Sequence, residues 1–126
     1  LLTSVLVQTQ QPQERSLYLK LGQRNALSIS IASVALRLKP DSEHSNILRN
    51  AAVAFGALAP TVVRARRIED AIIGVPLTEG TTEELADMAY SEVMPITDIR
   101  ASAEYRRAMA GALLKKGLQL LKVCVR

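Results

Sequence analysis

The chain has 126 residues, of which 48% are hydrophobic and 22% charged, so it is large enough for one domain and too apolar to be disordered. Aromatic residues make up only 3% of it, which leaves few platforms for stacking nucleic-acid bases. The net charge of +4 comes from basic residues that form no long run, so it allows a phosphate-binding or acidic partner without indicating one.

Metal and disulfide chemistry have few candidate residues. A single cysteine, Cys124, excludes an internal disulfide, and one cysteine with one histidine, His44, supports no metal site. No apolar run approaches the roughly 20 residues of a membrane-spanning helix, and no signal-peptide pattern is present. This composition suits a reducing cytoplasm. Because the chain begins with Leu and not Met, we expect it to be part of a longer or processed protein.

The chain is predicted to begin with short β-prone segments. Residues 1–8 read as a strand, and the polar stretch 9–15, which contains Pro12, reads as a loop. Residues 16–24 follow, with a turn that Gly22 permits.

Alternating apolar residues make 26–38 the clearest strand of the sequence. The large residues change face within this run, and a β-bulge near Ser33 would account for the change. Before the expected bulge, the large apolar residues Leu27, Ile29 and Ile31 share one face of the strand. The polar turn 40–46 leads into a returning strand over 47–55, and the two strands are expected to pair antiparallel.

Two helices are expected next. Thr61 can cap a helix over 62–73, which Gly74 is placed to end in the left-handed conformation. The capping box Thr81-x-x-Glu84 predicts another helix over 82–94.

The stretch Pro95–Arg107 gathers charged and capping residues before the last helix. Ser102 is a suitable N-cap for a helix from Ala103 to about Val123. Asp98 and the arginines around it are expected to form a hydrogen-bonded corner that locks this helix to the sheet. In that corner Arg100 would be a buried partner of Asp98 or of a carbonyl, and the hydroxyl of Tyr105 would be buried.

Other charged residues have structural interpretations. Arg64 and Arg66 would form ion pairs with Glu69 or Asp70 on a helix surface. No Ser/His/Asp or Cys/His set has a plausible spacing, so the residues alone indicate no catalytic group and no metal ligand. Because the predicted strands precede the predicted helices, the fold class is α+β: a small antiparallel β-meander sheet covered on one face by about three helices.

Four segments, in order, resemble the C-terminal domain of the FAD-binding (medium) subunit of molybdenum hydroxylases, the family of carbon monoxide dehydrogenase and xanthine dehydrogenase. Leu19–Arg24 is similar to its F-K-x-x-x-R segment, Ala26–Ala35 to A-L-D-I-A-x-V-x-x-A, and Gly56–Arg66 to G-x-x-A-P-T-P-x-R-A. The fourth segment is similar to D-x-R-x-S-x-x-Y-R, and its matching residues are Asp98, Arg100, Ser102, Tyr105 and Arg106. The resemblance covers about residues 15–123.

The sequence departs from the family pattern at three positions. Ser28 stands where the family has Asp, Val62 where it has the second proline of P-T-P, and Leu19 where it has Phe. The missing Asp puts in doubt any salt bridge that this segment makes in relatives, including one from Arg24.

The resemblance implies the fold of a CO dehydrogenase flavoprotein C-terminal domain over residues 15–126. Residues 1–14 would be a strand and linker from a preceding FAD-binding domain. It also implies a part in an oxidoreductase in which electrons pass from molybdopterin through [2Fe-2S] clusters to FAD. The implied partners are the FAD-binding domain of the same subunit, a molybdopterin-binding large subunit and an iron–sulfur small subunit, while this domain helps to close the flavin site and is not itself catalytic.

By the same resemblance, Lys20 is the residue expected to contact FAD, where its charge could favour an anionic reduced flavin. The alternative is an ordinary surface lysine. The six glycines are scattered and form no G-x-G cluster, so the chain alone is not expected to bind FAD.

A second interpretation of the chain is a stand-alone protein-interaction domain of the same fold that binds no flavin. The reading frame upstream of Leu1 would distinguish the two.

Overall fold

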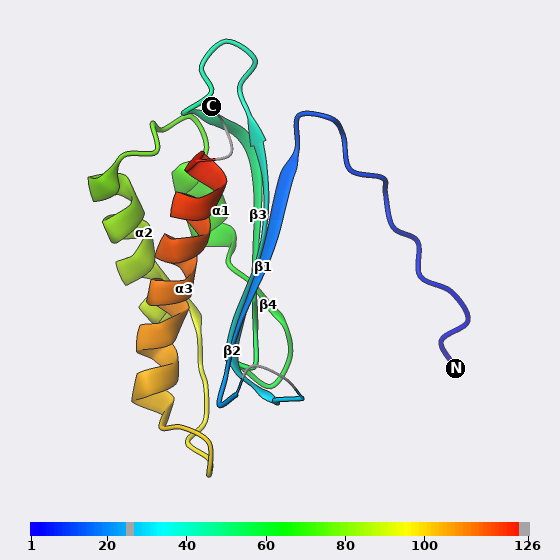
Figure 1. Ribbon diagram of the computed structural model, residues 1–126, viewed down its shortest axis with the longest axis vertical. Helices are drawn as coiled ribbons and strands as arrows, with labels where there is room; N and C mark the ends of the chain where they lie inside the picture. Colours follow the sequence, from blue (N-terminus) through cyan, green and yellow to red (C-terminus); the bar gives the residue numbers. More distant parts are fainter. Residues whose placement is uncertain (25–26, 124–126) are drawn as a thin grey trace.

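The computed structural model describes residues 1–24 and 27–123. Its elements in chain order are β1 (Arg15–Gly22), β2 (Ser30–Pro40), β3 (Leu48–Gly56), β4 (Val63–Arg64), α1 (Arg66–Ile72), α2 (Glu79–Glu92) and α3 (Ala103–Val123). The strands form one antiparallel sheet in the order β1-β2-β3-β4. The helices all lie on one side of it (Figure 1), which confirms the predicted α+β meander.

An aliphatic core lies between the sheet and the helices. Alternate side chains of the two central strands point toward the helices and are buried: Ala32, Val34, Leu36 and Leu38 of β2, and Ala51, Val53 and Phe55 of β3. The helices cover them with Ile68, Ile72, Leu85, Ala89, Leu114 and Leu118. Burying one Leu, Ile, Val or Phe side chain stabilises a fold by about 1.5–3 kcal/mol, so this layer supplies the main cohesion of the domain.

A bulge lies on β2 at Ile31, two residues before the predicted position. Leu21 and Gly22 are consecutive in β1, but their partners in β2 are Ala32 and Ser30, which leaves Ile31 as the extra residue. The prediction was therefore right about an irregularity and wrong about its place.

The apolar residues that precede the bulge lie outside the core. Leu27 and Ile29 are 93% and 66% exposed, although the alternation predicts that they share a strand face with Ile31.

Residues 1–11 form no regular structure, and Leu1 and Leu6 are exposed. The predicted strand over 1–8 is thus wrong for this chain, because a β-prone run needs a neighbouring strand to pair with.

The first helix is shorter than predicted. Val63–Arg64 pair with β3 as β4, because the edge of β3 is open there, and α1 begins only after Ala65. Thr61 therefore caps no helix, and no side chain caps α1. Gly74 has a φ of +74°, which confirms its predicted left-handed conformation.

The second helix begins earlier than its predicted capping box. Thr78, and not Thr81, is the N-cap: its side-chain oxygen accepts from the backbone N–H of Thr81 at 3.1 Å. The third helix follows the prediction, because the Ser102 hydroxyl oxygen accepts from the backbone N–H of Tyr105 at 3.1 Å. Within the described residues, none of the helices combines the length and the apolar character that crossing a bilayer requires.

Helices α2 and α3 approach each other closely at Gly111. A Cβ on Gly111 would lie 2.6 Å from the backbone carbonyl oxygen of Ala86, which cannot move aside as a side chain could. We expect Gly111→Ala to force the helices apart and to lower the free energy of unfolding by about 1–3 kcal/mol. Chemical denaturation of the purified chain measures this change.

Gly80, in the first turn of α2, provides the matched control. Its nearest neighbour to an added Cβ is the Thr78 side-chain oxygen at 3.9 Å, so there is room for a methyl group. Gly80→Ala should leave stability unchanged or raise it by up to about 1 kcal/mol. Equal effects of the two substitutions would contradict the close helix contact at Gly111.

Candidate functional site

Asp98 joins the loop before α3 to two arginine side chains. Its Oδ1 lies 2.6 Å from Nη2 of Arg106, and its Oδ2 accepts from Nη1 of Arg100 at 2.8 Å. Oδ1 also accepts from the backbone N–H groups of Arg100 at 2.9 Å and of Ala101 at 3.2 Å. The hydrogen bond from Arg106, followed by that from the Arg100 backbone, holds the pKa of Asp98 well below its ordinary value.

Arg106 is the buried member of this corner. Its residue is 5% exposed, and Nη1 donates to the carbonyl oxygens of Ile31 at 3.3 Å and of Ala57 at 3.0 Å. The guanidinium therefore connects α3 to the bulge of β2 and to the residue that follows β3. Ala57 has a φ of +60°, so the chain turns sharply where its carbonyl meets the arginine.

The predicted corner exists, but two of its members differ from the prediction. The Arg100 side chain is 35% exposed, so the buried partner of Asp98 is Arg106 and not Arg100. Tyr105 is 45% exposed, so its hydroxyl is not buried. A sequence signal for Arg106 was available, because it lies in helical phase with the buried residues Ala110 and Leu114.

Arg64 and Arg66 form the predicted ion pairs with Glu69. Arg64 Nε donates to Oε1 of Glu69 at 2.7 Å, and Arg66 Nη1 lies 3.3 Å from Oε2. Oε1 also accepts from the backbone N–H of Val53 at 2.8 Å, beyond the end of short β4. Burial opposes ionisation of Glu69, but the hydrogen bonds from Arg64 and Val53 outweigh it and lower its pKa. These charges hold α1 to the sheet edge and are structural.

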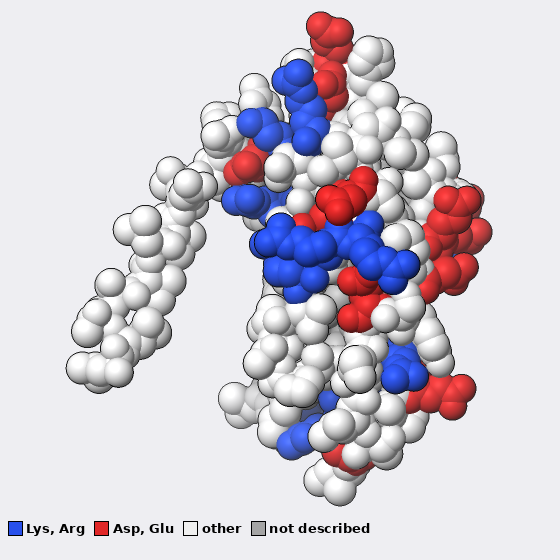
Figure 2. Space-filling view, turned by 180° about the vertical axis from the view of Figure 1, so that it is seen from behind, with Lys and Arg blue, Asp and Glu red and all other residues white. Residues whose placement is uncertain are grey.

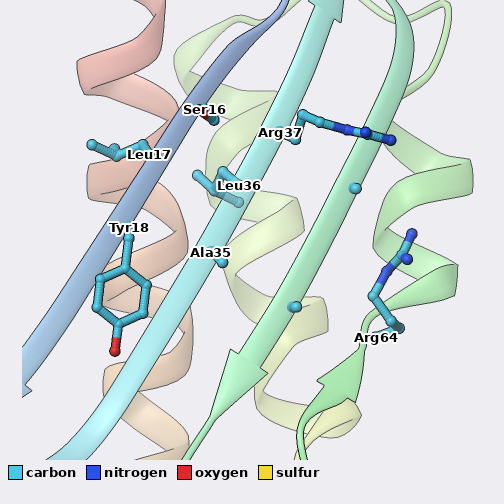
Figure 3. A pocket seen from close by; sticks show the side chains of 9 residues that line it. Ser16, Leu17, Tyr18, Ala35, Leu36, Arg37 and Arg64 are labelled. Atoms are coloured by element: carbon cyan, nitrogen blue, oxygen red, sulfur yellow. The ribbon is translucent and has the colours of Figure 1, made fainter. Parts of the chain in front are cut away.

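The sheet has one face that no helix covers, which we call the open face. It carries the outward side chains of the four strands, including Tyr18, Lys20, Ser33, Ala35, Arg37, Ala52, Ala54, Gly56 and Arg64. The alanines at its centre, Ala35, Ala52 and Ala54, leave a shallow groove of about 430 Å³. Figure 3 shows this groove, with Tyr18 on β1 and Arg37 extending from β2 toward β3.

The charged side chains that the described strands place on the open face are all basic. The space-filling view from behind shows Lys and Arg side chains gathered in the middle of the molecule, with acidic side chains beside them (Figure 2). Arg64 forms a salt bridge with Glu69, which Arg66 shares. Lys20 and Arg37 carry no salt bridge within the described part of the chain, so their charges are available to a ligand or a partner.

Lys20 lies at the hairpin end of the open face. It pairs with Ser33 across β1 and β2, and Ser33 pairs in turn with Gly56 of β3. Its Nζ donates to the carbonyl oxygen of Ser28 at 3.1 Å, which directs the ammonium group toward the hairpin. Lys20 itself is exposed, although its partner Ser33 is buried, so a ligand could reach the ammonium group.

Ser28 replaces the aspartate of the family pattern without an ion pair to Arg24. Arg24 Nη2 instead donates to the carbonyl oxygen of Leu27 at 2.9 Å. The Ser28 hydroxyl accepts from the backbone N–H of Gln23 at 3.1 Å, so its role is to close the hairpin.

The other residues singled out for metal or redox chemistry are not brought together. His44 Nδ1 is 3.8 Å from Oδ1 of Asp41 in an exposed turn. Over residues 1–24 and 27–123, no three His, Cys, Asp or Glu side chains gather closely enough to hold a metal ion. Cys124 lies outside the described residues.

The two arginines of the Asp98 corner should differ strongly in their effect on stability. Arg106→Met leaves two carbonyl oxygens without their donor, and each such loss costs about 1–3 kcal/mol when the group is buried. Arg100→Ala removes a partly exposed ion pair, which contributes about 0–1 kcal/mol. Thermal and denaturant unfolding of the two variants compare them. A larger loss for Arg100→Ala than for Arg106→Met would contradict the geometry.

The lowered pKa of Asp98 predicts a pH-dependent stability. The unfolded chain binds a proton at Asp98 near its ordinary pKa of about 4, whereas the folded chain binds it only at lower pH. The contribution is therefore complete above pH ~5 and is lost as the pH falls through the acid range. In Asp98→Asn the melting temperature should fall less steeply below pH ~4 than in the wild type. Parallel slopes for the two proteins would refute the assignment.

The chain is similar to proteins of known type over most of its length. Residues 17–121 match the CO dehydrogenase flavoprotein C-terminal domain family. The chain is 32% identical over 108 residues to the xanthine dehydrogenase FAD-binding subunit of Escherichia coli O157:H7, which covers 84% of this chain and 36% of that protein. It is 29% identical over 96 residues to the glyceraldehyde dehydrogenase medium chain of Sulfolobus acidocaldarius, with 76% of this chain and 33% of that one covered.

The fold gives the same result. The carbon monoxide dehydrogenase of Hydrogenophaga pseudoflava superposes with a TM-score of 0.79 at 28% identity, over 86% of this chain and 37% of that one. Quinoline 2-oxidoreductase from Pseudomonas putida 86 superposes with a TM-score of 0.80 at 20% identity, over 90% and 39%. The chain thus spans little more than a third of the length of these relatives. It belongs to the CO dehydrogenase flavoprotein C-terminal domain family.

Proposed function

We propose that the chain is the C-terminal domain of the FAD-containing subunit of a molybdenum hydroxylase-type oxidoreductase, in which the open face of its sheet closes the flavin site. The observation that carries the proposal is the position of Lys20 on a face that its own helices leave uncovered, in a chain that matches the family over residues 17–121. The relatives named above as an FAD-binding subunit and as medium chains support a place in a multi-subunit dehydrogenase.

The open face fits one part of FAD and not another. Around Lys20 it offers an ammonium group beside the small residues Ser33 and Gly56, which suits the polar edge of a flat flavin ring. Binding a diphosphate needs several converging backbone N–H groups, and no glycine cluster of the sequence supplies such a cradle. The chain would therefore form one wall of the flavin site, while a preceding FAD-binding domain holds the phosphates.

The N-terminal segment supports this arrangement. Residues 1–14 precede the sheet, and the apolar side chains of Leu1, Leu6 and Val7 are exposed. In Figure 1 this segment leaves the domain on the side away from the helices, which is the side of the open face. We take residues 1–14 as the connection from the FAD-binding domain, which forms no strand in this chain by itself, with residues 15–126 as the C-terminal domain.

The chemistry of the chain itself would be electrostatic. A bound flavin carries electrons between a donor and an acceptor, and its reduced form can be an anion. Lys20 would stabilise that anion and so favour reduction, because an opposite charge nearby favours the charged form. Molybdopterin and [2Fe-2S] clusters would belong to the large and small partner subunits, from which electrons reach FAD, and this domain would help to dock those subunits.

The charge of Lys20 is testable in the assembled FAD-containing subunit. Lys20→Met keeps most of the side-chain length and removes the charge, so it should lower the reduction potential of the flavin. At a modest effective dielectric constant, a charge several ångströms away contributes on the order of 1–3 kcal/mol. Potentiometric titration of wild type and variant measures the shift.

Lys116→Met is the matched control, since Lys116 is exposed on α3, in the helix layer. It removes the same charge and should leave the potential unchanged. If Lys20→Met changes neither the potential nor the FAD affinity, Lys20 is an ordinary surface residue and not part of the flavin site.

A further inference from the structure

We propose that Arg106 is a positioning residue for Lys20. It would act by holding the bulge of β2, which sets the direction of the hairpin that presents the lysine. This inference rests on the proposed function of Lys20, because positioning matters only if the lysine faces a flavin. Arg106 itself is buried, and its polar contacts are with the carbonyls of Ile31 and Ala57 and the carboxylate of Asp98.

The bulge leaves a carbonyl that the sheet does not use. Ile31 is the extra residue of β2 between the partners of Leu21 and Gly22, so its backbone lies outside the regular ladder. Arg106 Nη1 lies 3.3 Å from the Ile31 carbonyl oxygen and 3.0 Å from that of Ala57. The side chain therefore ties the bulge to the turn after β3.

The geometry requires an arginine. One terminal nitrogen contacts the two carbonyl oxygens while the other lies 2.6 Å from Oδ1 of Asp98, so a planar group with separated donors serves three acceptors. A lysine would keep the positive charge beside Asp98 but has a single nitrogen. Because Asp98 compensates the charge of Arg106, the effect on Lys20 would be mechanical and not electrostatic.

The hairpin beyond the bulge connects this anchor to Lys20. Ser30 pairs with Gly22, and Ser28 lies two residues before Ser30, on the hairpin side of the bulge. Ser28 accepts through its carbonyl oxygen from Lys20 Nζ at 3.1 Å, and through its hydroxyl from the backbone N–H of Gln23 at 3.1 Å. The angle between the bulge and the segment that precedes it thus determines where the carbonyl oxygen of Ser28, the acceptor for Lys20, lies.

Gly22 shows how closely the two hairpin strands approach. A Cβ on Gly22 would lie 2.1 Å from the Ser28 hydroxyl oxygen and 3.0 Å from its Cβ. Ser28 can therefore occupy its position only because Gly22 has no side chain. A small change in the angle of the bulge would move Ser28 relative to both Gly22 and Lys20.

Amide hydrogen exchange in the 126-residue chain tests the anchor without any cofactor. We expect Arg106→Lys to accelerate exchange of the Gln23 amide, which bonds Ser28, by about tenfold or more relative to the Val53 amide, which bonds Glu69 in the core. General destabilisation would accelerate both amides together and leave the ratio unchanged. An unchanged ratio overturns the proposal.

Arg107→Lys is the matched control for this measurement. Arg107 follows Arg106 in the sequence, but its guanidinium lies over the ring of Tyr90, 5.8 Å from the centroid, on the α2 side of α3. The same substitution there should leave the Gln23 to Val53 ratio unchanged, and an equal rise would overturn the proposal. If Arg106→Lys does not fold, Asp98→Asn replaces it, because it frees Nη2 and should raise the same ratio by a smaller factor.

A double-mutant cycle in the FAD-containing subunit separates this inference from the proposed function. If Arg106 acts through Lys20, Arg106→Lys lowers the flavin potential in the wild type and has no further effect in Lys20→Met. A shift with Lys20→Met but none with Arg106→Lys overturns the positioning role alone. No shift with Lys20→Met overturns the proposed function, and the exchange ratio then still decides whether Arg106 holds the hairpin.

Discussion

The buried guanidinium of Arg106 is the interaction on which the rest of this domain depends. A charge in the interior is tolerated only when it is compensated. Nη1 donates to the carbonyls of Ile31 and Ala57 and Nη2 forms an ion pair with Asp98, while Nε has no hydrogen-bond partner within the described residues. Those groups come from the loop before α3, the bulge of β2 and the end of β3. One side chain therefore sets the relation between the longest helix and the hairpin end of the sheet, where the proposed contact with a flavin lies.

The division of the sheet into two faces supports the proposal that another domain covers the open face. One face is closed by aliphatic side chains of all three helices, and the other carries Tyr18, Lys20 and Arg37 over a floor of small residues. Alanine and glycine on that floor bury little area against solvent, so they add little stability there, yet they let a flat group approach the backbone. A surface of this kind suits a contact with another domain and a cofactor between them.

Most of the conspicuous charges of the sequence hold the architecture together. At the sheet edge, Glu69 forms ion pairs with Arg64 and Arg66 and accepts a hydrogen bond from the backbone N–H of Val53, where β4 is too short to continue the ladder. Glu83 and Lys115 join α2 to α3 at 2.7 Å. Lys20 and Arg37 have no salt bridge within the described residues, and both lie on the open face. This contrast supports assigning the function to the open face and not to the Asp98 corner.

The sequence by itself determined the fold class, the antiparallel central strands, the left-handed conformation of Gly74 and the capped start of α3 at Ser102, because local spacing and residue type decide these features. It also indicated a corner around Asp98. Only the tertiary structure decided that Arg106 and not Arg100 is buried there, that the bulge lies at Ile31, and that residues 1–8 form no strand. These outcomes depend on which distant carbonyls and strands come within reach, and local spacing carries no information about such partners.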